Sequence, residues 1–160
     1  VCEVLEAVLT LLRPSFSLKQ ASLRIELDGL RQCRIQGDRN HLEATFSALV
    51  GNALDAIPRK GAIQIRGEVR GDRQAEISIE DDGPGIPEAF WPRVFEPFFT
   101  TKPAGQGTGL GLAISRNIVE DHGGTLLLQN RNEGGLRATV RLPLCKESLV
   151  SPLAVEEKTA

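Results

Sequence analysis

Four of the eight residues in the run 105–112 (GQGTGLGL) are glycine, and a segment with helical spacing of apolar residues follows directly. Glycines at alternate positions leave backbone N–H groups uncovered, so that a ligand can approach them closely. A helix that begins behind them adds the positive end of its dipole, which favours an anion such as a nucleotide phosphate. The alternative is a flexible loop before a helix, because a single glycine motif often matches by chance.

A second candidate is the turn 81–87 (DDGPGIP), which follows the apolar strand-like segment 75–79. A carboxylate at Asp81 can accept a hydrogen bond from an exocyclic amine such as that of adenine. Gly83 and Gly85 would let a flat ligand lie against the backbone. The alternative is an ordinary Asp-Gly turn with no ligand.

A third candidate is the pair Asn52 and Asp55, which interrupts an otherwise apolar helical pattern. Residues three apart share a helix face. An amide oxygen and a carboxylate suit a hard cation such as Mg²⁺, which binds a few oxygen ligands and keeps several waters. The alternative is a polar pair on a solvated helix face.

The segment 95–102 (FEPFFTTK) places three phenylalanines within the Gly- and Pro-rich stretch 83–107. Stretches longer than about 12–15 residues without regular structure are usually functional lids or disordered. The aromatic side chains would anchor such a lid to the core, and the Lys102 ammonium would lie near the glycine run, within reach of a terminal phosphate. The alternative is a small satellite core with a surface lysine.

Composition excludes several classes of function. The formal net charge of -2 gives no electrostatic basis for nucleic-acid binding, and no apolar run approaches the roughly 18 residues of a membrane span. We therefore expect no contact of this chain with nucleic acid or membrane. The sequence contains no methionine, which suggests an excised or processed fragment. Its three cysteines form no CxxC pair and are expected as free thiols in a reducing cytosol, which places the chain in the cytoplasm.

The elements that would position these residues follow from apolar periodicity and turn residues. Pro14 limits or bends the first helix, Asp38 caps the second, and His41 and His122 fall at helix ends as capping or surface residues. We expect helices at 3–12, from Asp38 to Pro58 and at 108–122, and strands at 22–28, 33–36, 62–70, 74–81, 125–130 and 136–142. The fold class is α+β, a two-layer α/β sandwich whose mixed, mostly antiparallel sheet carries helices on one face. Residues 1–145 would form one domain and 146–160 a flexible C-terminal tail.

Taken in this order, the motifs resemble the catalytic and ATP-binding domain of bacterial sensor histidine kinases, a member of the GHKL superfamily with gyrase, Hsp90 and MutL. The resemblance covers roughly residues 3–144. The segment 95–102 has the F-box form common in kinases similar to the nitrogen-regulation sensor. The other motif residues are Asn52 for the N box, Asp81, Gly83 and Gly85 for the DxGxG box, and Gly107, Gly109 and Gly111 for the GxGxG box.

The resemblance implies a Bergerat ATP-binding fold, with ATP between sheet and lid. Asn52 would hold Mg²⁺, Asp81 would contact the adenine amine, and Asn52 and Lys102 would be the catalytic residues. The reaction would transfer the ATP γ-phosphoryl group to a histidine, mostly by positioning and charge neutralisation. The residues expected to contact ATP are Asn52, Asp55, Asp81, Gly83, Gly85, Ile86, Phe95, Thr101, Lys102, Gly107, Thr108, Gly109, Leu110 and Gly111.

The sequence departs from the family pattern at three points. Ala48 stands where many members carry a second asparagine and where ATP-hydrolysing relatives carry a glutamate base. Asp55 replaces a basic residue found in many kinases. No helix carries the histidine phosphoacceptor motif, so the expected partners are a dimerisation and phosphoacceptor domain of the same protein and, downstream, a response regulator. The alternatives are a nucleotide-binding regulatory module without transfer activity and a GHKL-type serine kinase.

Overall fold

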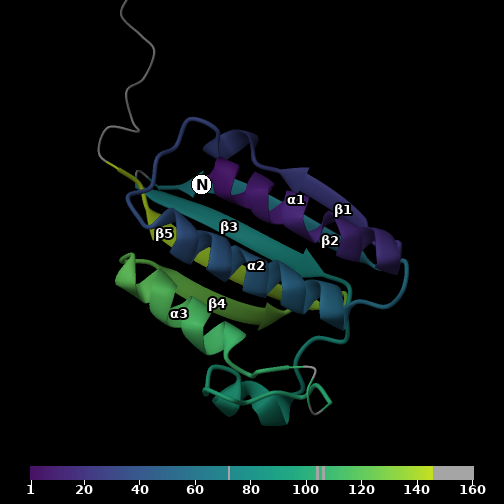
Figure 1. Cartoon of the computed structure of the whole chain (residues 1–160). Coiled ribbons are helices and arrows are strands. Elements are labelled where there is room, and N and C mark those ends of the chain that lie inside the picture. The colour runs from purple at the N-terminus through teal and green to yellow at the C-terminus, as the bar shows by residue number, and fades with distance from the viewer. Residues whose placement is uncertain (72, 104, 106, 146–160) are drawn as a thin grey trace, which may run out of the picture.

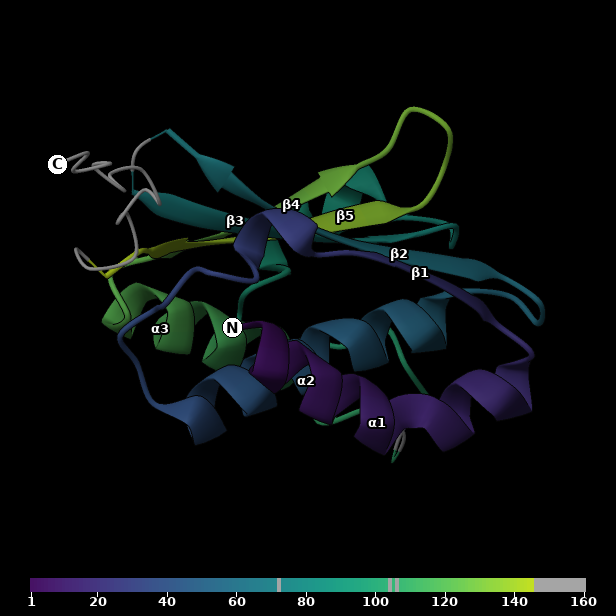
Figure 2. The ribbon, with the colours of Figure 1, turned by 90° about the horizontal axis from the view of Figure 1, so that it is seen from above.

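The computed structural model describes residues 1–71, 73–103, 105 and 107–145. A five-stranded sheet forms one layer, and the α-helices of these residues pack on one of its faces as the second layer (Figures 1 and 2). The elements in chain order are α1 (Cys2–Lys19), β1 (Ser22–Glu26), the 3₁₀ helix η1 (Asp28–Leu30), α2 (Arg39–Ala56), β2 (Ala62–Arg70), β3 (Gln74–Asp81), the 3₁₀ helix η2 (Glu88–Arg93), α3 (Gly111–Asp121), β4 (Thr125–Asn130) and β5 (Leu136–Pro143). The predicted two-layer α+β class is confirmed.

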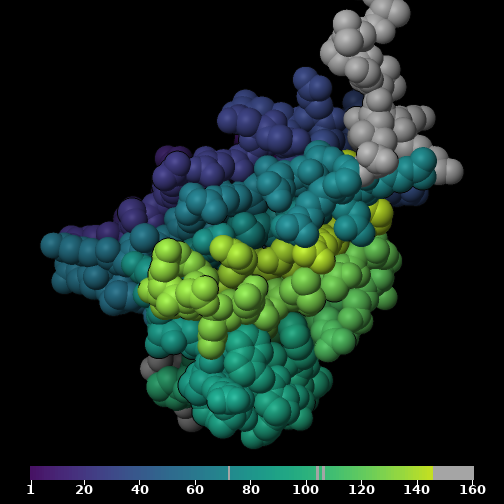
Figure 3. All heavy atoms as spheres, turned by 180° about the vertical axis from the view of Figure 1, so that it is seen from behind, coloured from purple at the N-terminus to yellow at the C-terminus, as the bar shows by residue number. Residues whose placement is uncertain are grey.

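The strands lie in the order β1-β2-β3-β5-β4. β1 runs parallel to β2, because α2 crosses between them, and every other pairing is antiparallel. The pairing register sets Ile65 opposite Ile79 and Ile77 opposite Val140, so their side chains point to the same face. That face is the one covered by helices, and Figure 3 shows the opposite face, which the helices leave open.

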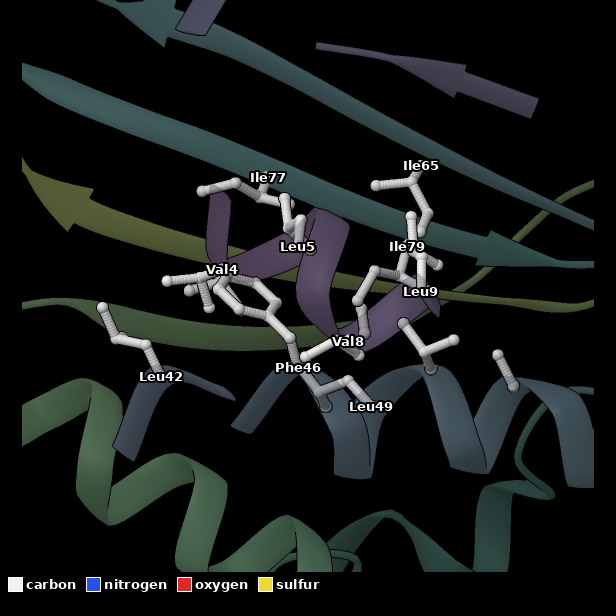
Figure 4. Close-up of a cluster of buried hydrophobic side chains, with 14 of the residues drawn as sticks. Val4, Leu5, Val8, Leu9, Leu42, Phe46, Leu49, Ile65, Ile77 and Ile79 are labelled. Atoms are coloured by element: carbon white, nitrogen blue, oxygen red, sulfur yellow. The ribbon is translucent and has the colours of Figure 1, made fainter. Parts of the chain in front are cut away.

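The main core lies between this sheet face and the first two helices (Figure 4). Apolar residues at helical spacing on α1 and α2 meet isoleucines at alternate positions of β2 and β3. The residues labelled in that view are Val4, Leu5, Val8, Leu9, Leu42, Phe46, Leu49, Ile65, Ile77 and Ile79, all of them buried. This packing fixes α2 along the sheet, so the polar residues near its C-terminal end have a defined position.

The first helix is longer than the predicted 3–12, since α1 continues through Pro14 to Lys19. Pro14 has no N–H to offer the carbonyl of Thr10 and costs the helix one hydrogen bond. Two residues later, however, Phe16 is buried against the core with 7% exposure. Burial of that ring outweighs the local penalty, and the helix ends only where Gln20 adopts a left-handed φ of 55°.

The strand predicted at 33–36 is also wrong, because the structure has only an isolated bridge between Ile35 and Leu144 there. Both edges of β5 are occupied by β3 and β4, so this segment can pair only past the strand end. The strand predicted at 22–28 stops at Glu26, since Asp28 begins η1. The tail predicted at 146–160 lies outside the described residues, as does Asp72 between the predicted strands 62–70 and 74–81.

Several local predictions are confirmed. The Asp38 side chain caps α2 by accepting hydrogen bonds from the N–H groups of Asn40 and His41 at 2.7 and 3.1 Å, and these bonds lower the pKa of Asp38. The limits of β2, β3 and β4 are those predicted. Beyond these predictions, the structure places Gly134 and Gly135 in the turn between β4 and β5 with φ of 92° and 89°, values that disfavour any residue with a side chain.

His122 joins the C-terminal end of α3 to the start of α2. Its Nε2 accepts a hydrogen bond from the Asp38 N–H at 3.0 Å, while Nδ1 lies 2.7 Å from the Ile118 carbonyl and donates to it in the tautomer that this arrangement requires. A Cβ on Gly37 would overlap the His122 ring, so glycine is needed for this approach. His122 is therefore a structural residue, in agreement with its predicted capping role.

The three cysteines have free thiols, as expected, and are half-buried. Among the described residues, we find no helix that combines the length and the apolar character needed to cross a membrane.

Candidate functional site

A cavity of about 520 Å³ lies between α2, the end of β3, the segment 83–107 and the start of α3. Its volume is within the range of small-molecule sites. Three predicted residues, Gly83, Phe95 and Leu110, lie outside the lining. The predicted residues that line it are Asn52, Asp55, Asp81, Gly85, Ile86, Thr101, Lys102, Gly107, Thr108, Gly109 and Gly111. One cavity thus brings together residues from all four sequence motifs.

Asp81 is the last residue of β3 and lies on the helix-covered face of the sheet, with 4% exposure. Its Oδ1 accepts hydrogen bonds from the N–H groups of Gly83 at 2.9 Å and Leu136 at 3.2 Å. Burial raises the pKa of Asp81, and the two N–H groups partly offset that effect. Because Oδ1 is held by the backbone, Oδ2 is the carboxylate oxygen left for a ligand amine in the cavity.

The glycines that follow Asp81 are required by close packing. A Cβ on Gly83 would lie 2.9 Å from Asp81 Oδ1 and 3.0 Å from the carbonyl oxygen of Ala56. Gly85 has a φ of 72° and would bring a Cβ within 2.7 Å of Asn130 Oδ1. Gly83 therefore supports the Asp81 carboxylate from outside the cavity, whereas Gly85 forms part of the cavity wall.

Asn52 and Asp55 lie on one face near the C-terminal end of α2, as their spacing predicts. The Lys102 ammonium forms an ion pair with Asp55 Oδ2 and lies 3.4 Å from Asn52 Oδ1. The Asn52 and Asp55 side-chain oxygens therefore already contact a positive charge, and Mg²⁺ would present a positive charge to the same two oxygens. Among the described residues no group of three or more His, Cys, Asp or Glu side chains could hold a metal by itself. A magnesium ion here would need further oxygens from phosphate or water.

The N-terminus of α3 opens onto the same cavity. The predicted helix start at Thr108 is wrong by three residues, because Gly109 has a φ of 65° that no α-helix accommodates, and α3 begins at Gly111. The cap residue Leu110 provides no side-chain hydrogen bond to the first turn. The first N–H groups of α3 are thus available to an anion, and Gly111 and Leu112 line the cavity beside them.

Two glycines of the run also have packing partners in the lid, the name we use for residues 83–107. A Cβ on Gly107 would lie 2.8 Å from Thr100 Oγ1, and a Cβ on Gly109 would overlap the Phe98 carbonyl. The Phe98 N–H donates to the Gly109 carbonyl at 2.9 Å. The glycines of the run therefore have two roles: they pack closely against the lid, and they leave the backbone of the run uncovered.

The lid phenylalanines divide into three environments. Phe95 packs against the main core and lies under the Arg116 guanidinium, 5.0 Å from its ring centre. Phe99 meets Phe90 of η2 edge-on at 5.6 Å and lines the cavity with it. Phe98 is 74% exposed, with a strained φ of 69°. Both readings of the sequence are thus correct in part: Phe95 anchors the lid, and Phe90 and Phe99 form a small core within it.

Sequence reasoning missed the apolar wall of the cavity and the support for Asp81. The wall residues are Ile79, Phe90, Val94, Leu112, Leu128 and Ala138. Their types and spacing are those of ordinary core positions, so the sequence gives no signal that they border a ligand. Arg131 was missed too, although its guanidinium donates to the Asp81 carbonyl at 2.7 Å. A charged residue in a turn has no distinguishing pattern.

Comparison with known proteins identifies the family. Residues 37–146, more than half of the chain, match the family described as histidine kinase-, DNA gyrase B- and HSP90-like ATPases. The chain belongs to this family. The cavity of this ATPase domain, with its motif residues from α2, β3, the lid and α3, confirms the resemblance drawn from the motifs.

Curated relatives of this ATPase domain are named as sensor proteins, among them a sensor histidine kinase. It is 47% identical over 94 residues to the sensor histidine kinase GtrS of Pseudomonas aeruginosa, which covers 59% of this chain and 20% of GtrS. It is 40% identical over 136 residues to the C4-dicarboxylate transport sensor protein DctB of Rhizobium meliloti, which covers 82% of this chain and 21% of DctB. The chain thus spans about a fifth of the length of these two relatives.

Solved structures match over nearly the whole ATPase domain. The catalytic domain of histidine kinase ThkA superposes with a TM-score of 0.81 at 34% identity, covering 92% of this chain and 95% of that one. A structure of ThkA in complex with the response regulator protein TrrA matches with a TM-score of 0.77 at 30% identity, covering 92% of this chain and 41% of that one. The fold is therefore that of histidine kinase catalytic domains.

Proposed function

We propose that this chain is the ATP-binding catalytic domain of a two-component sensor and transfers the ATP γ-phosphoryl group to a histidine on a separate domain of the same protein. The observation that carries the proposal is the single cavity that Asp81, Asn52, Lys102 and the α3 N-terminus all border. Membership of the ATPase family and the sensor histidine kinases among the named relatives support it.

Each end of the cavity has a part in this reaction. Asp81 accepts a hydrogen bond from the adenine amine, and Ile86 and the apolar wall bury the base. The N–H groups of the α3 first turn bind phosphate oxygens. Asn52 holds Mg²⁺, which when bound neutralises phosphate charge. Lys102, paired with Asp55 on the cavity wall, lies where its ammonium can exchange that carboxylate for a terminal phosphate.

Ala48 favours transfer to a histidine over hydrolysis of ATP. It lines the cavity one helical turn before Asn52, and its methyl group cannot activate a water. The site thus contributes positioning and charge neutralisation but no base at this position, which suits attack by an imidazole that is already nucleophilic. The same arrangement disfavours a gyrase-like or Hsp90-like ATPase.

The remaining assignments rest on the same proposal. Residues 1–145 act as one cytoplasmic catalytic domain, and the phosphorylated histidine passes its phosphoryl group to a response regulator. The likeness to ThkA, which has a structure in complex with a response regulator, supports that partner class.

The proposal is tested by incubating the chain with labelled ATP, Mg²⁺ and a separately purified histidine-bearing domain of the full-length protein. We expect label on that domain that survives alkali and is lost in acid, as a phosphohistidine would be. ATP binding without transfer would instead identify a regulatory module, and acid-stable label would identify a serine kinase.

A further inference from the structure

Immediately after Asp81 the chain crosses over the end of the sheet, at the turn that joins β4 and β5. β5 and then β4 lie beyond β3 in the sheet, and residues 82–86 pass over the turn 131–135 that joins those two strands. A Cβ on Gly135 would overlap the Asp81 carbonyl oxygen, so the crossing is in close contact. In Figure 3 the yellow-green end of this hairpin lies directly against the teal lid. The crossing segment thus joins Asp81 to Ile86, and both residues line the cavity.

Asn130, the last residue of β4, holds Ile86 at the far end of this crossing. Its Oδ1 accepts a hydrogen bond from the Ile86 N–H, and its Nδ2 donates to the Ile86 carbonyl, both at 2.8 Å. The amide therefore pairs with both backbone groups of one residue, as a neighbouring strand would. Gly85 makes room for it, because any Cβ there would lie 2.7 Å from Asn130 Oδ1.

Arg131, the next residue, holds the other end. Its guanidinium donates to the Asp81 carbonyl at 2.7 Å and lies 3.4 Å from the Glu80 carboxylate, which is 5% exposed. Arg137 binds the same carboxylate at 3.0 Å. The Glu80 carboxylate thus holds the Arg131 guanidinium in place. Two consecutive residues, Asn130 and Arg131, therefore set the separation between Ile86 and Asp81.

We propose that Asn130 is a positioning residue that determines selectivity for adenine over guanine. The inference rests on the proposed function, since it assumes a base between Asp81 and Ile86. Adenine carries an amine where guanine carries a carbonyl, so the Asp81 carboxylate attracts one and repels the other. That discrimination requires the base to stay in register with Asp81. Ile86 borders the same cavity. While Asn130 holds Ile86 in place, Ile86 keeps the base from shifting away from the Asp81 carboxylate.

The test compares three variants by calorimetric titration with ATP and GTP. Asn130→Ala removes both hydrogen bonds to Ile86, and Asn130→Asp keeps the acceptor but sets a carboxylate against the Ile86 carbonyl. Asn132→Ala, an exposed asparagine in the same turn, is the matched control. We expect the ATP-to-GTP affinity ratio to fall about tenfold in Asn130→Ala, because adenine then loses its register with Asp81 and with it about one hydrogen bond that guanine never makes. It should also fall in Asn130→Asp and stay unchanged in Asn132→Ala.

Hydrogen exchange at the Ile86 amide separates positioning from simple stability. We expect faster exchange in Asn130→Ala, which removes the acceptor of the Ile86 N–H, with a folded core by circular dichroism. If Ile86 exchanges faster while the ATP-to-GTP ratio is unchanged, Asn130 has only a structural role and the inference is overturned. If Asn130→Ala does not fold, the ratio in Asn130→Asp decides. A wild-type chain that binds neither nucleotide would refute the proposed function itself, which is a distinct result.

Discussion

Replacing Asp81 by asparagine separates its role in binding from its role in folding. The Oδ1 atom of Asp81 is held by the N–H groups of Gly83 and Leu136. An asparagine must keep its oxygen toward these two donors, so its NH₂ group faces the cavity. An adenine amine would then meet a donor where it needs an acceptor.

The two effects have opposite signs. A hydrogen bond to a charged group contributes about 1.5–3 kcal/mol, so its loss should weaken ATP binding roughly 10- to 150-fold. For folding, burial raises the pKa of Asp81 above its ordinary 3.8. A raised pKa means that the favourable contribution of this carboxyl is complete below 3.8 and is lost as pH rises through the raised value. Asparagine removes that cost, so the variant should melt higher than wild type at neutral pH but not at pH 3.

The assay combines calorimetric titration with ATP at pH 7.5 and thermal melting at pH 7.5 and pH 3. Asp82→Asn is the control, because Asp82 is exposed and lies outside the cavity lining. Unchanged ATP affinity in Asp81→Asn would refute the contact with the amine. A lower melting temperature at pH 7.5 would show that the carboxylate stabilises the fold, and the separation of binding from stability would then fail.

Three further predictions concern the lid. Lys102→Met should weaken ATP binding about tenfold more than ADP binding, since only ATP has the terminal phosphate that Lys102 would contact; equal losses by calorimetry would exclude that contact. Gly109→Ala should lower the melting temperature, with a cost of at least about 1 kcal/mol, because it adds a clash with Phe98 to the strain of a φ of 65°. Gly134→Ala, with a φ of 92° and open space, should cost less, and a reversed order would contradict the lid pairing. Trp91, in η2 beside the cavity residue Phe90, should change its fluorescence when ATP binds, and a constant signal during calorimetric binding would show that η2 does not respond.

Much of the fold could be predicted because its signals are local. β2 and β3 alternate apolar and polar residues between clear turns, and their predicted limits are those observed. Asp38 caps α2 through contacts within three residues along the chain. The predictions that failed were those in which tertiary packing overrides the local signal. Burial of Phe16 stabilises the first helix beyond Pro14. The segment at Ile35 is not a strand because no strand edge is free to pair with it.

The sequence predicted which residues would border the candidate site better than it predicted the contacts that hold them there. Asp81 and Lys102 were selected from residue type and spacing, because each places a charged group next to a glycine-rich turn, and both line the cavity. Asn130 could not be found this way, because its contact with Ile86 spans 44 residues and is made to backbone atoms, which leave no pattern in sequence. The glycines were predicted from the room that they leave for a ligand, and the structure adds a second reason, because a Cβ on Gly83 or Gly109 would clash with neighbouring atoms of the folded chain.

The two ends of the cavity differ in how firmly their residues are held, and this difference bears on function. At the sheet end, the Asp81 carboxylate is buried and bound by two backbone N–H groups, so a base meets a preorganised acceptor. At the lid end, Lys102 is held by Asp55, whose side chain is 58% exposed. Ion pairs this exposed contribute about 0–1 kcal/mol, so a phosphate can take over the ammonium at little cost. Under the proposed function, base selectivity would therefore reside in the rigid sheet end, and the response to a terminal phosphate in a lysine that is easily released.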